Sequence, residues 1–275
     1  MATTGLSPDV DRLKARLRSI WMAGDYDRFS RYLEDGAREF YERIPKIPGG
    51  TWLDVACGSG QLALLAARDG HDVTGVDIAG NLIEQARARA STAELKARFE
   101  VADAEALPFA GAQFDVVTSL IGAMFAPRPE LVAAELLRVC QPGGIIAMAN
   151  WTPQGFVGQM FKAVSNFIAP SGMPSPVLWG EETTVRERLG SGLSDLRLTR
   201  RAYPFRYPFP PAEVVQHFRL YYGPIHQAFA ALGGRESEEL RYALEALWTR
   251  HNRAGQGGTM VSAEYLEVIG VRAVS

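Results

Sequence analysis

The amino-acid sequence predicts an α/β fold, in which a mostly parallel sheet is covered by helices on both faces. Short apolar runs alternate with helical patterns between residues 51 and 151, which is typical of parallel β-α-β units. The run Phe114–Leu120 is apolar almost throughout, as strands buried on both faces are. Turn residues such as Gln141–Gly144 separate the helical patterns from the strands.

Composition places the chain among ordinary globular proteins. Its 275 residues are 47% hydrophobic and 22% charged. The net charge of −2 provides no basic field, so we expect no nucleic-acid partner. No apolar run reaches about 18 residues and no signal peptide is apparent, so we expect no membrane span. The two cysteines, Cys57 and Cys140, form no disulfide framework, and a cytoplasmic protein is expected.

Residues 8–44 are predicted to be helical, with apolar side chains at helical spacing from Leu13 to Ile44. Gly24 and Asp25 interrupt this pattern directly before Tyr26. We expect residues 1–45 to form a helical lid over a binding site. The alternative is that this aromatic stripe serves only packing.

The stretch Thr51–Ala67 combines a strand, a glycine turn and a helix, in that order. Trp52–Val55 has the pattern of a short buried strand, and the turn Cys57–Gly60 follows it. Glycines allow the backbone to approach a ligand closely, and the start of the helix offers unpaired N–H groups. This arrangement predicts a nucleotide-type binding loop.

Two kinds of cofactor use such a loop. Gly58 and Gly60 satisfy the G-x-G-x-x-G/A pattern of dinucleotide folds, and Asp77 lies about 20 residues further on, as that pattern requires. The glycine pattern alone therefore leaves both kinds of cofactor open. Asp54, at the end of the strand, favours a positively charged ligand, because a carboxylate there would repel a pyrophosphate and attract an ammonium or a sulfonium.

The same stretch resembles the first motif of class I S-adenosylmethionine-dependent methyltransferases, D-x-G-x-G-x-G, with Ala56 in place of the first glycine. Alanine tolerates a positive φ poorly, so the turn is expected to be slightly altered. The resemblance is specific over Thr51–Trp151 and concerns only the layout elsewhere. It implies a Rossmann-like, seven-stranded, mostly parallel sheet, and S-adenosyl-L-methionine as the cofactor.

The resemblance also implies roles for residues at the ends of the strands. Asp77 would bind the ribose hydroxyls, although it could instead cap the next helix. Asp103 and Ala104 would bind the adenine, although Asp103 could be a plain surface residue. Tyr26 could reach the carboxylate end of the cofactor. The cofactor-binding residues that we expect are Tyr26, Asp54, Ala56, Gly58, Gly60, Asp77, Ile78, Asp103, Ala104 and Leu120.

The C-terminal part is expected to complete the sheet and to cover the substrate. Residues 196–203 and 259–271 alternate as an antiparallel pair of strands, and residues 210–252 form a helical cap. His217, Tyr221 and His226 in this cap are candidate general bases. The alternative is that they only pack among aromatic side chains. No cluster of histidine, cysteine and carboxylate residues has metal-ligand spacing, so no metal is expected.

These observations predict one methyltransferase domain over residues 1–275, with a lid (1–45), a cofactor-binding core (46–152) and the end of the sheet with its cap (153–275). The expected reaction is methyl transfer to a small molecule that is aromatic, quinone-like or a natural product. An NAD(P)-dependent oxidoreductase and a non-catalytic S-adenosylmethionine-binding protein remain as alternatives. The oligomeric state is left open.

Overall fold

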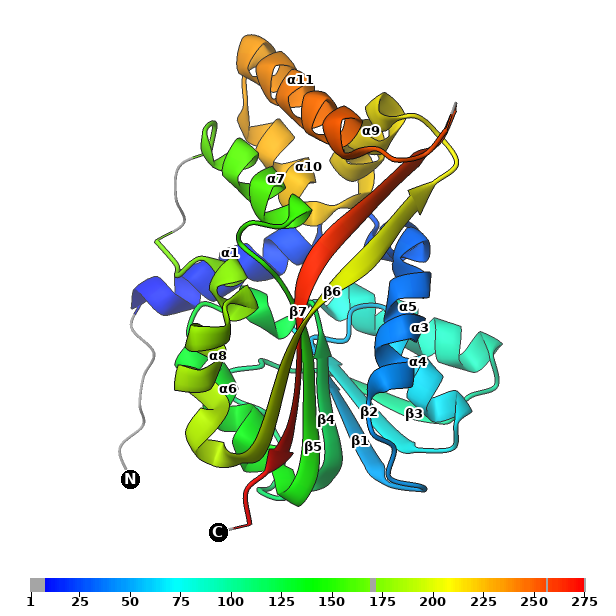
Figure 1. Cartoon of the computed structure of the whole chain (residues 1–275), viewed down its shortest axis with the longest axis vertical. Coiled ribbons are helices and arrows are strands. Elements are labelled where there is room, and N and C mark those ends of the chain that lie inside the picture. Colours follow the sequence, from blue (N-terminus) through cyan, green and yellow to red (C-terminus); the bar gives the residue numbers. More distant parts are fainter. Residues whose placement is uncertain (1–7, 169–171, 256, 275) are drawn as a thin grey trace.

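A seven-stranded sheet forms the centre of the computed structural model, which describes residues 8–168, 172–255 and 257–274. The strand order is β3-β2-β1-β4-β5-β7-β6 (Figure 1). Strand β7 is antiparallel to both of its neighbours, and the other pairs are parallel. The predicted fold class is thereby confirmed. The strands are β1 (Thr51–Val55), β2 (Asp72–Asp77), β3 (Ala97–Val101), β4 (Phe114–Leu120), β5 (Cys140–Trp151), β6 (Leu193–Tyr207) and β7 (Thr259–Arg272).

The strand order reverses between β1 and β4, which places a crevice at the carboxyl ends of the parallel strands. Asp54 of β1 pairs with Gly75 of β2 on one side and with Thr118 of β4 on the other. The end of β1 therefore lies at this reversal. The loops that directly follow the parallel strands, including the glycine turn after β1, therefore lie along the same edge of the sheet.

Helices cover both faces of the sheet. Helices α3, α4 and α5 lie on one face, and α6 and α8 lie on the other (Figure 1). Helix α1 runs across the upper edge of the sheet, and α7, α9, α10 and α11 stand above it. The helices are α1 (Pro8–Met22), α2 (Tyr26–Ser30), α3 (Glu34–Arg43), α4 (Gln61–Arg68), α5 (Gly80–Thr92), α6 (Pro129–Val139), α7 (Phe156–Ser165), α8 (Glu182–Leu189), α9 (Pro211–Tyr221), α10 (Gly223–Ala231) and α11 (Gly234–His251).

The helical region predicted over residues 210–252 consists of the three helices α9, α10 and α11. Leu240, Leu244 and Trp248 of α11 are buried, as their helical spacing indicates. Trp248 packs edge-on against Phe218 of α9, with the ring centroids 5.2 Å apart. Aromatic contacts therefore tie the cap together. Within the described ranges, no helix is long and apolar enough to cross a membrane.

Candidate functional site

The turn after β1 is wound through left-handed backbone conformations. Ala56 and Gly58 both have a φ of 56°, and Gly60 has a φ of 86°. The Ala56 methyl group fits because the neighbouring residue, Gly122, has no side chain. A Cβ built on Gly122 would be only 2.6 Å from the Ala56 Cβ, so any larger residue at position 122 would clash with Ala56. The alanine therefore keeps the positive φ that the motif requires, at the strain expected of a non-glycine residue.

Asp54 is a buried carboxylate, 1% exposed, in the wall of a cavity above this turn. Its Oδ2 accepts the Ala63 N–H at 3.2 Å, and its Oδ1 lies 3.1 Å from the Thr118 hydroxyl. No cationic side chain pairs with it among the residues that the structure describes. Burial raises the pKa of Asp54 to about 7, the hydrogen bonds lower it, and the nearby Asp77 adds a further increase.

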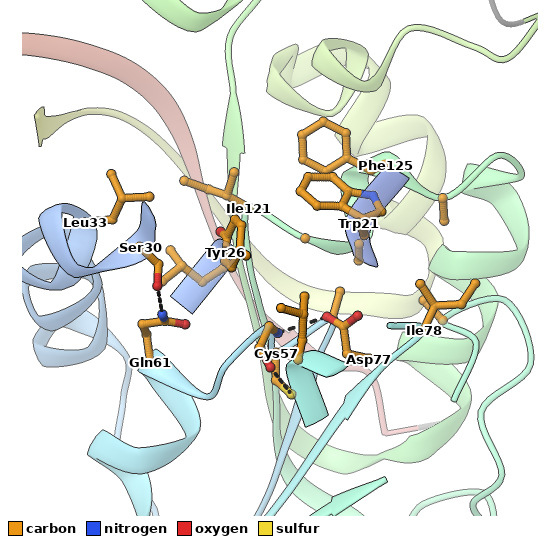
Figure 2. A pocket seen from close by; sticks show the side chains of 18 of the residues that line it. Trp21, Tyr26, Ser30, Leu33, Cys57, Gln61, Asp77, Ile78, Ile121 and Phe125 are labelled. Atoms are coloured by element: carbon orange, nitrogen blue, oxygen red, sulfur yellow. Dashed lines mark hydrogen bonds between the residues drawn. The ribbon is translucent and has the colours of Figure 1, made fainter. Parts of the chain in front are cut away.

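Asp77 organises the turn from the end of β2. Its Oδ2 accepts the Gly58 N–H at 2.9 Å (Figure 2), and its Oδ1 accepts the Ala79 N–H at 2.9 Å. Burial raises the pKa of Asp77, although these backbone hydrogen bonds oppose the increase. The N-cap of α5 is Ala79 and not Asp77. The carboxylate therefore does not act as the helix cap that was its alternative role, and it lies in the cavity wall.

Asp103, after β3, is joined to the N-terminal helix. The Lys14 ammonium of α1 is hydrogen-bonded to Asp103 Oδ2 and lies 2.5 Å from Glu105 Oε2. Glu105 is also paired with the Arg128 guanidinium at 2.7 Å. Lys14 and Glu105 are both buried. A buried ion-pair network therefore holds α1 against the strand end where adenine is expected to bind.

We expect the Lys14→Ala variant to release S-adenosylhomocysteine about tenfold faster than the wild type. Removing one partner of a buried ion pair leaves the remaining charges uncompensated, which costs several kcal/mol and loosens α1. Stopped-flow displacement of the bound ligand measures this rate. Arg16→Ala, on an exposed position of the same helix, is the control. An unchanged dissociation rate in Lys14→Ala would show that α1 does not hold the ligand.

The cavity runs along the carboxyl edge of the sheet and encloses about 1350 Å³, including its open mouth. Its charged lining residues within the described chain are Lys14, Asp54, Asp77 and Asp103, which belong to α1 and to the ends of β1, β2 and β3. The part of the wall formed by α7, β6 and the C-terminal end of α9 contributes no charged side chain among the described residues. We call that part the acceptor side, and it is lined by Val157, Met160, Tyr203, Phe205, Phe218 and Tyr222.

The N-terminal segment closes the cavity with aromatic side chains. Trp21 and Tyr26 lie over the turn and Asp77, together with Phe125 from the loop after β4 (Figure 2). Tyr26 lies against the turn itself, because a Cβ built at Gly58 would be 3.2 Å from its ring. Gln61 donates hydrogen bonds to Ser59 Oγ at 2.9 Å and to Ser30 Oγ, which links α4 to α2 (Figure 2).

The structure brings nearly all the expected cofactor residues to this one cavity. Gly60 is the exception: it does not line the cavity, and a Cβ built on it would come within 3.3 Å of Ala86 and Phe99. The others line the wall: Tyr26, Asp54, Ala56, Gly58, Asp77, Ile78, Asp103, Ala104 and Leu120.

The three candidate bases do not line the cavity. His217 is stacked on Phe29, which lies between it and the cavity, and burial lowers the pKa of His217. The Tyr221 ring is covered by the Arg28 guanidinium, and His226 Nδ1 lies 3.0 Å from the Arg219 carbonyl oxygen. Helix α9 presents Phe218 to the cavity instead. These placements correspond to the packing alternative for all three residues.

Comparisons with known proteins identify the cofactor. Residues 53–148 match a family model described as a methyltransferase domain. The chain is also similar to a 2-methyl-6-phytyl-1,4-hydroquinone methyltransferase from Synechocystis, with 41% identity over 105 residues. The aligned stretch covers 38% of this chain and 33% of the relative. The chain belongs to the class I S-adenosylmethionine-dependent methyltransferases. Its cofactor is therefore S-adenosylmethionine, which resolves the choice that the glycine pattern left open.

Two further similarities extend over most of the methyltransferase. An uncharacterized protein of Mycobacterium tuberculosis is 36% identical over 225 residues, which are 80% of this chain and 82% of that protein. The fold also matches phosphoethanolamine N-methyltransferase 2 of Haemonchus contortus, solved with S-adenosylhomocysteine. That match has a TM-score of 0.56 at 17% identity and covers 87% of this chain and 53% of the other. This similarity concerns the fold alone.

The residues of the methyltransferase fit this cofactor on structural grounds. Asp54 is a buried carboxylate without a cationic partner, and the methionine part of S-adenosylmethionine carries an ammonium group that would compensate its charge. A Cβ built at Gly58 would be 3.2 Å from the Tyr26 ring, so a side chain would be crowded here, and the turn lines the cavity with backbone. Both features fit a positively charged ligand that lies close to the turn.

Proposed function

We propose that this methyltransferase transfers the methyl group to an uncharged, flat aromatic acceptor, such as a hydroquinone. One observation carries the proposal: among the described residues, the acceptor side is apolar and aromatic, and the charged lining residues come instead from α1 and from the ends of β1, β2 and β3. Burial of an aromatic ring against such a wall is favourable, whereas a carboxylate or phosphate there would be desolvated without a cationic partner. The hydroquinone methyltransferase relative supports the same class of acceptor.

We assign the cofactor to the residues that the sequence indicated, except that Gly60, expected to hold the methionine part, is now given a supporting role because it does not line the cavity. Asp54 and the turn at Ala56 and Gly58 hold the methionine part, and Asp77 holds the ribose. The remaining contacts are Tyr26 at the carboxylate end, Ile78 beside the ribose, Asp103 with Ala104 at the adenine, Leu120 near the sulfur, and Gly60 as support for the turn. When bound, the cofactor supplies a methyl group activated by a positively charged sulfur.

The protein then contributes orientation and a dry chamber rather than a side-chain base. Trp21, Tyr26 and Phe125 cover the turn (Figure 2), and Tyr203 and Phe205 of β6 line the acceptor side. No imidazole lines the cavity among the described residues, so the acceptor needs an electron-rich atom of its own, and the proton that it loses on methylation passes to water. A hydroquinone ring meets this requirement, because its hydroxyl groups donate electrons to the ring.

A panel of acceptors tests the proposal through the release of S-adenosylhomocysteine. Methylhydroquinone, kept reduced with ascorbate, is compared with dihydroxybenzoate, a similar ring that carries a carboxylate. We expect turnover with methylhydroquinone and a rate at least tenfold lower with dihydroxybenzoate. The Asp77→Ala variant controls for release unrelated to the site. Turnover confined to charged acceptors would contradict the proposal and leave the cofactor assignment in place.

A further inference from the structure

We infer that Tyr222 is a positioning residue that holds an oxygen atom of the acceptor by a hydrogen bond from its phenol. This inference rests on the proposed function, because it concerns how an aromatic acceptor is oriented on the acceptor side. It adds that the acceptor carries a hydroxyl or carbonyl oxygen at a fixed position on its ring. The inference stands on the hydrogen bonds and the packing of the tyrosines that line the cavity.

Three tyrosines line the cavity, and their hydroxyl groups differ in what they contact. The Tyr203 hydroxyl donates to the Leu33 carbonyl oxygen at 2.7 Å, so its hydrogen is already used. Tyr26 lies against Gly58, in the turn that is expected to hold the cofactor, and burial together with the nearby Asp77 carboxylate raises its pKa. The Tyr222 hydroxyl has no hydrogen-bond partner within the described chain. It is therefore the unused phenol of the acceptor side.

The Tyr222 ring is held in place on several sides. It is stacked on Phe29 with the centroids 4.7 Å apart and the planes 25° apart, and it meets Trp21 and Phe218 edge-on at 5.9 and 5.6 Å. The backbone is held as well: the Tyr222 N–H donates to the Phe218 carbonyl oxygen at 3.0 Å, and the Tyr222 carbonyl oxygen accepts from the His226 N–H at 2.8 Å. A ring fixed in this way presents its hydroxyl at a defined point.

A comparison with Tyr207 shows that the free Tyr222 hydroxyl is a feature of the cavity. The Tyr207 hydroxyl also has no partner among the described residues, but it is fully buried and Tyr207 does not line the cavity. The Tyr222 hydroxyl is not sealed in this way. Burial raises the pKa of Tyr222, so the phenol keeps its hydrogen and remains a donor at neutral pH. A polar group that faces an otherwise apolar wall is well placed to orient a ligand.

The test uses two probes of the same shape and the protein saturated with S-adenosylhomocysteine. One probe is methylhydroquinone, and the other is the trimethylbenzene in which methyl groups replace both hydroxyls. Calorimetric titration gives a dissociation constant for each probe. In Tyr222→Phe, we expect methylhydroquinone to bind about five- to tenfold more weakly and trimethylbenzene to bind within twofold of the wild type, as the loss of one hydrogen bond requires. Tyr207→Phe, the matched control, is expected to change neither constant.

Each other outcome has a defined meaning. Equal weakening of both probes, or no change in either, overturns the inference, because the phenol then does not recognise an oxygen. If the wild type binds trimethylbenzene alone, the apolar site stands and the inference fails. If the wild type binds neither probe, the proposed function fails and the inference fails with it. Retained binding of S-adenosylhomocysteine shows that the variant is folded. If Tyr222→Phe does not fold, the wild type alone still tests the inference. The difference in its affinity for the two probes must then favour methylhydroquinone by more than the difference in their octanol–water transfer free energies predicts.

Discussion

The Asp77→Ala variant is expected to bind S-adenosylhomocysteine about a hundredfold more weakly than the wild type. The substitution removes the proposed acceptor for the ribose hydroxyls, and it also leaves the Gly58 and Ala79 N–H groups without their partner. Each unpaired buried group costs about 1–3 kcal/mol, so the loss of ligand contact and the loosening of the turn add to each other. Isothermal titration calorimetry measures the change in the dissociation constant.

Asp72→Ala is the matched control for this variant. Asp72 begins the same strand, its side chain is exposed, and its ion pair with Arg98 lies at the opposite end of the sheet. We expect its affinity to remain within twofold of the wild type. An Asp77→Ala variant that keeps both its melting temperature and its affinity would show that the ribose does not lie at this strand end.

The second large effect is a dependence of cofactor affinity on pH. Burial raises the pKa of Asp54 to about 7 in the free protein, and the cofactor's ammonium would favour the ionised form and lower that pKa. Affinity for S-adenosylhomocysteine should therefore fall by up to about tenfold for each pH unit below about 7, and it should level off above that value. Titrations in matched buffers across this range measure the slope.

The stability of the free protein should change in the opposite direction. Because the folded-state pKa of Asp54 lies above its ordinary value of 3.8, its contribution to stability is fully present below about pH 4 and is lost as the pH rises through about 7. The increase in melting temperature caused by S-adenosylhomocysteine should therefore grow with pH over that window. Asp54→Asn removes the titrating group and should reduce the slope, with any residual slope coming from Asp77. An unaltered slope would mean that another group controls binding.

The sequence was informative where chemistry and periodicity coincide. The acids Asp54, Asp77 and Asp103 each lie at or next to the end of a predicted strand, and parallel strands bring their carboxyl ends to one edge, so their convergence could be predicted. The helical insertion was also predictable, because Leu240, Leu244 and Trp248 follow a helical stripe. Those predictions depend on local sequence patterns and on the rule that the carboxyl ends of parallel strands lie at one edge of a sheet.

The acceptor side could not be predicted in the same way. Tyr203 and Phe205 alternate along β6 as any buried strand residues do, and only the pairing of β6 with β7 brings them to the cavity. The adjacent residues His217 and Phe218 lie on one turn of α9, and the packing of the helix determines that Phe218 reaches the wall. The role of Lys14 was missed because its partners are Asp103 and Glu105, about 90 residues away.

The N-terminal segment carries Lys14, which is held at the adenine end, and also Trp21 and Phe29, which contact Tyr222 on the acceptor side. A single piece of chain thus closes both ends of one chamber. Movement of this segment would open both ends together, so the exchange of the cofactor and the exchange of the acceptor should be coupled.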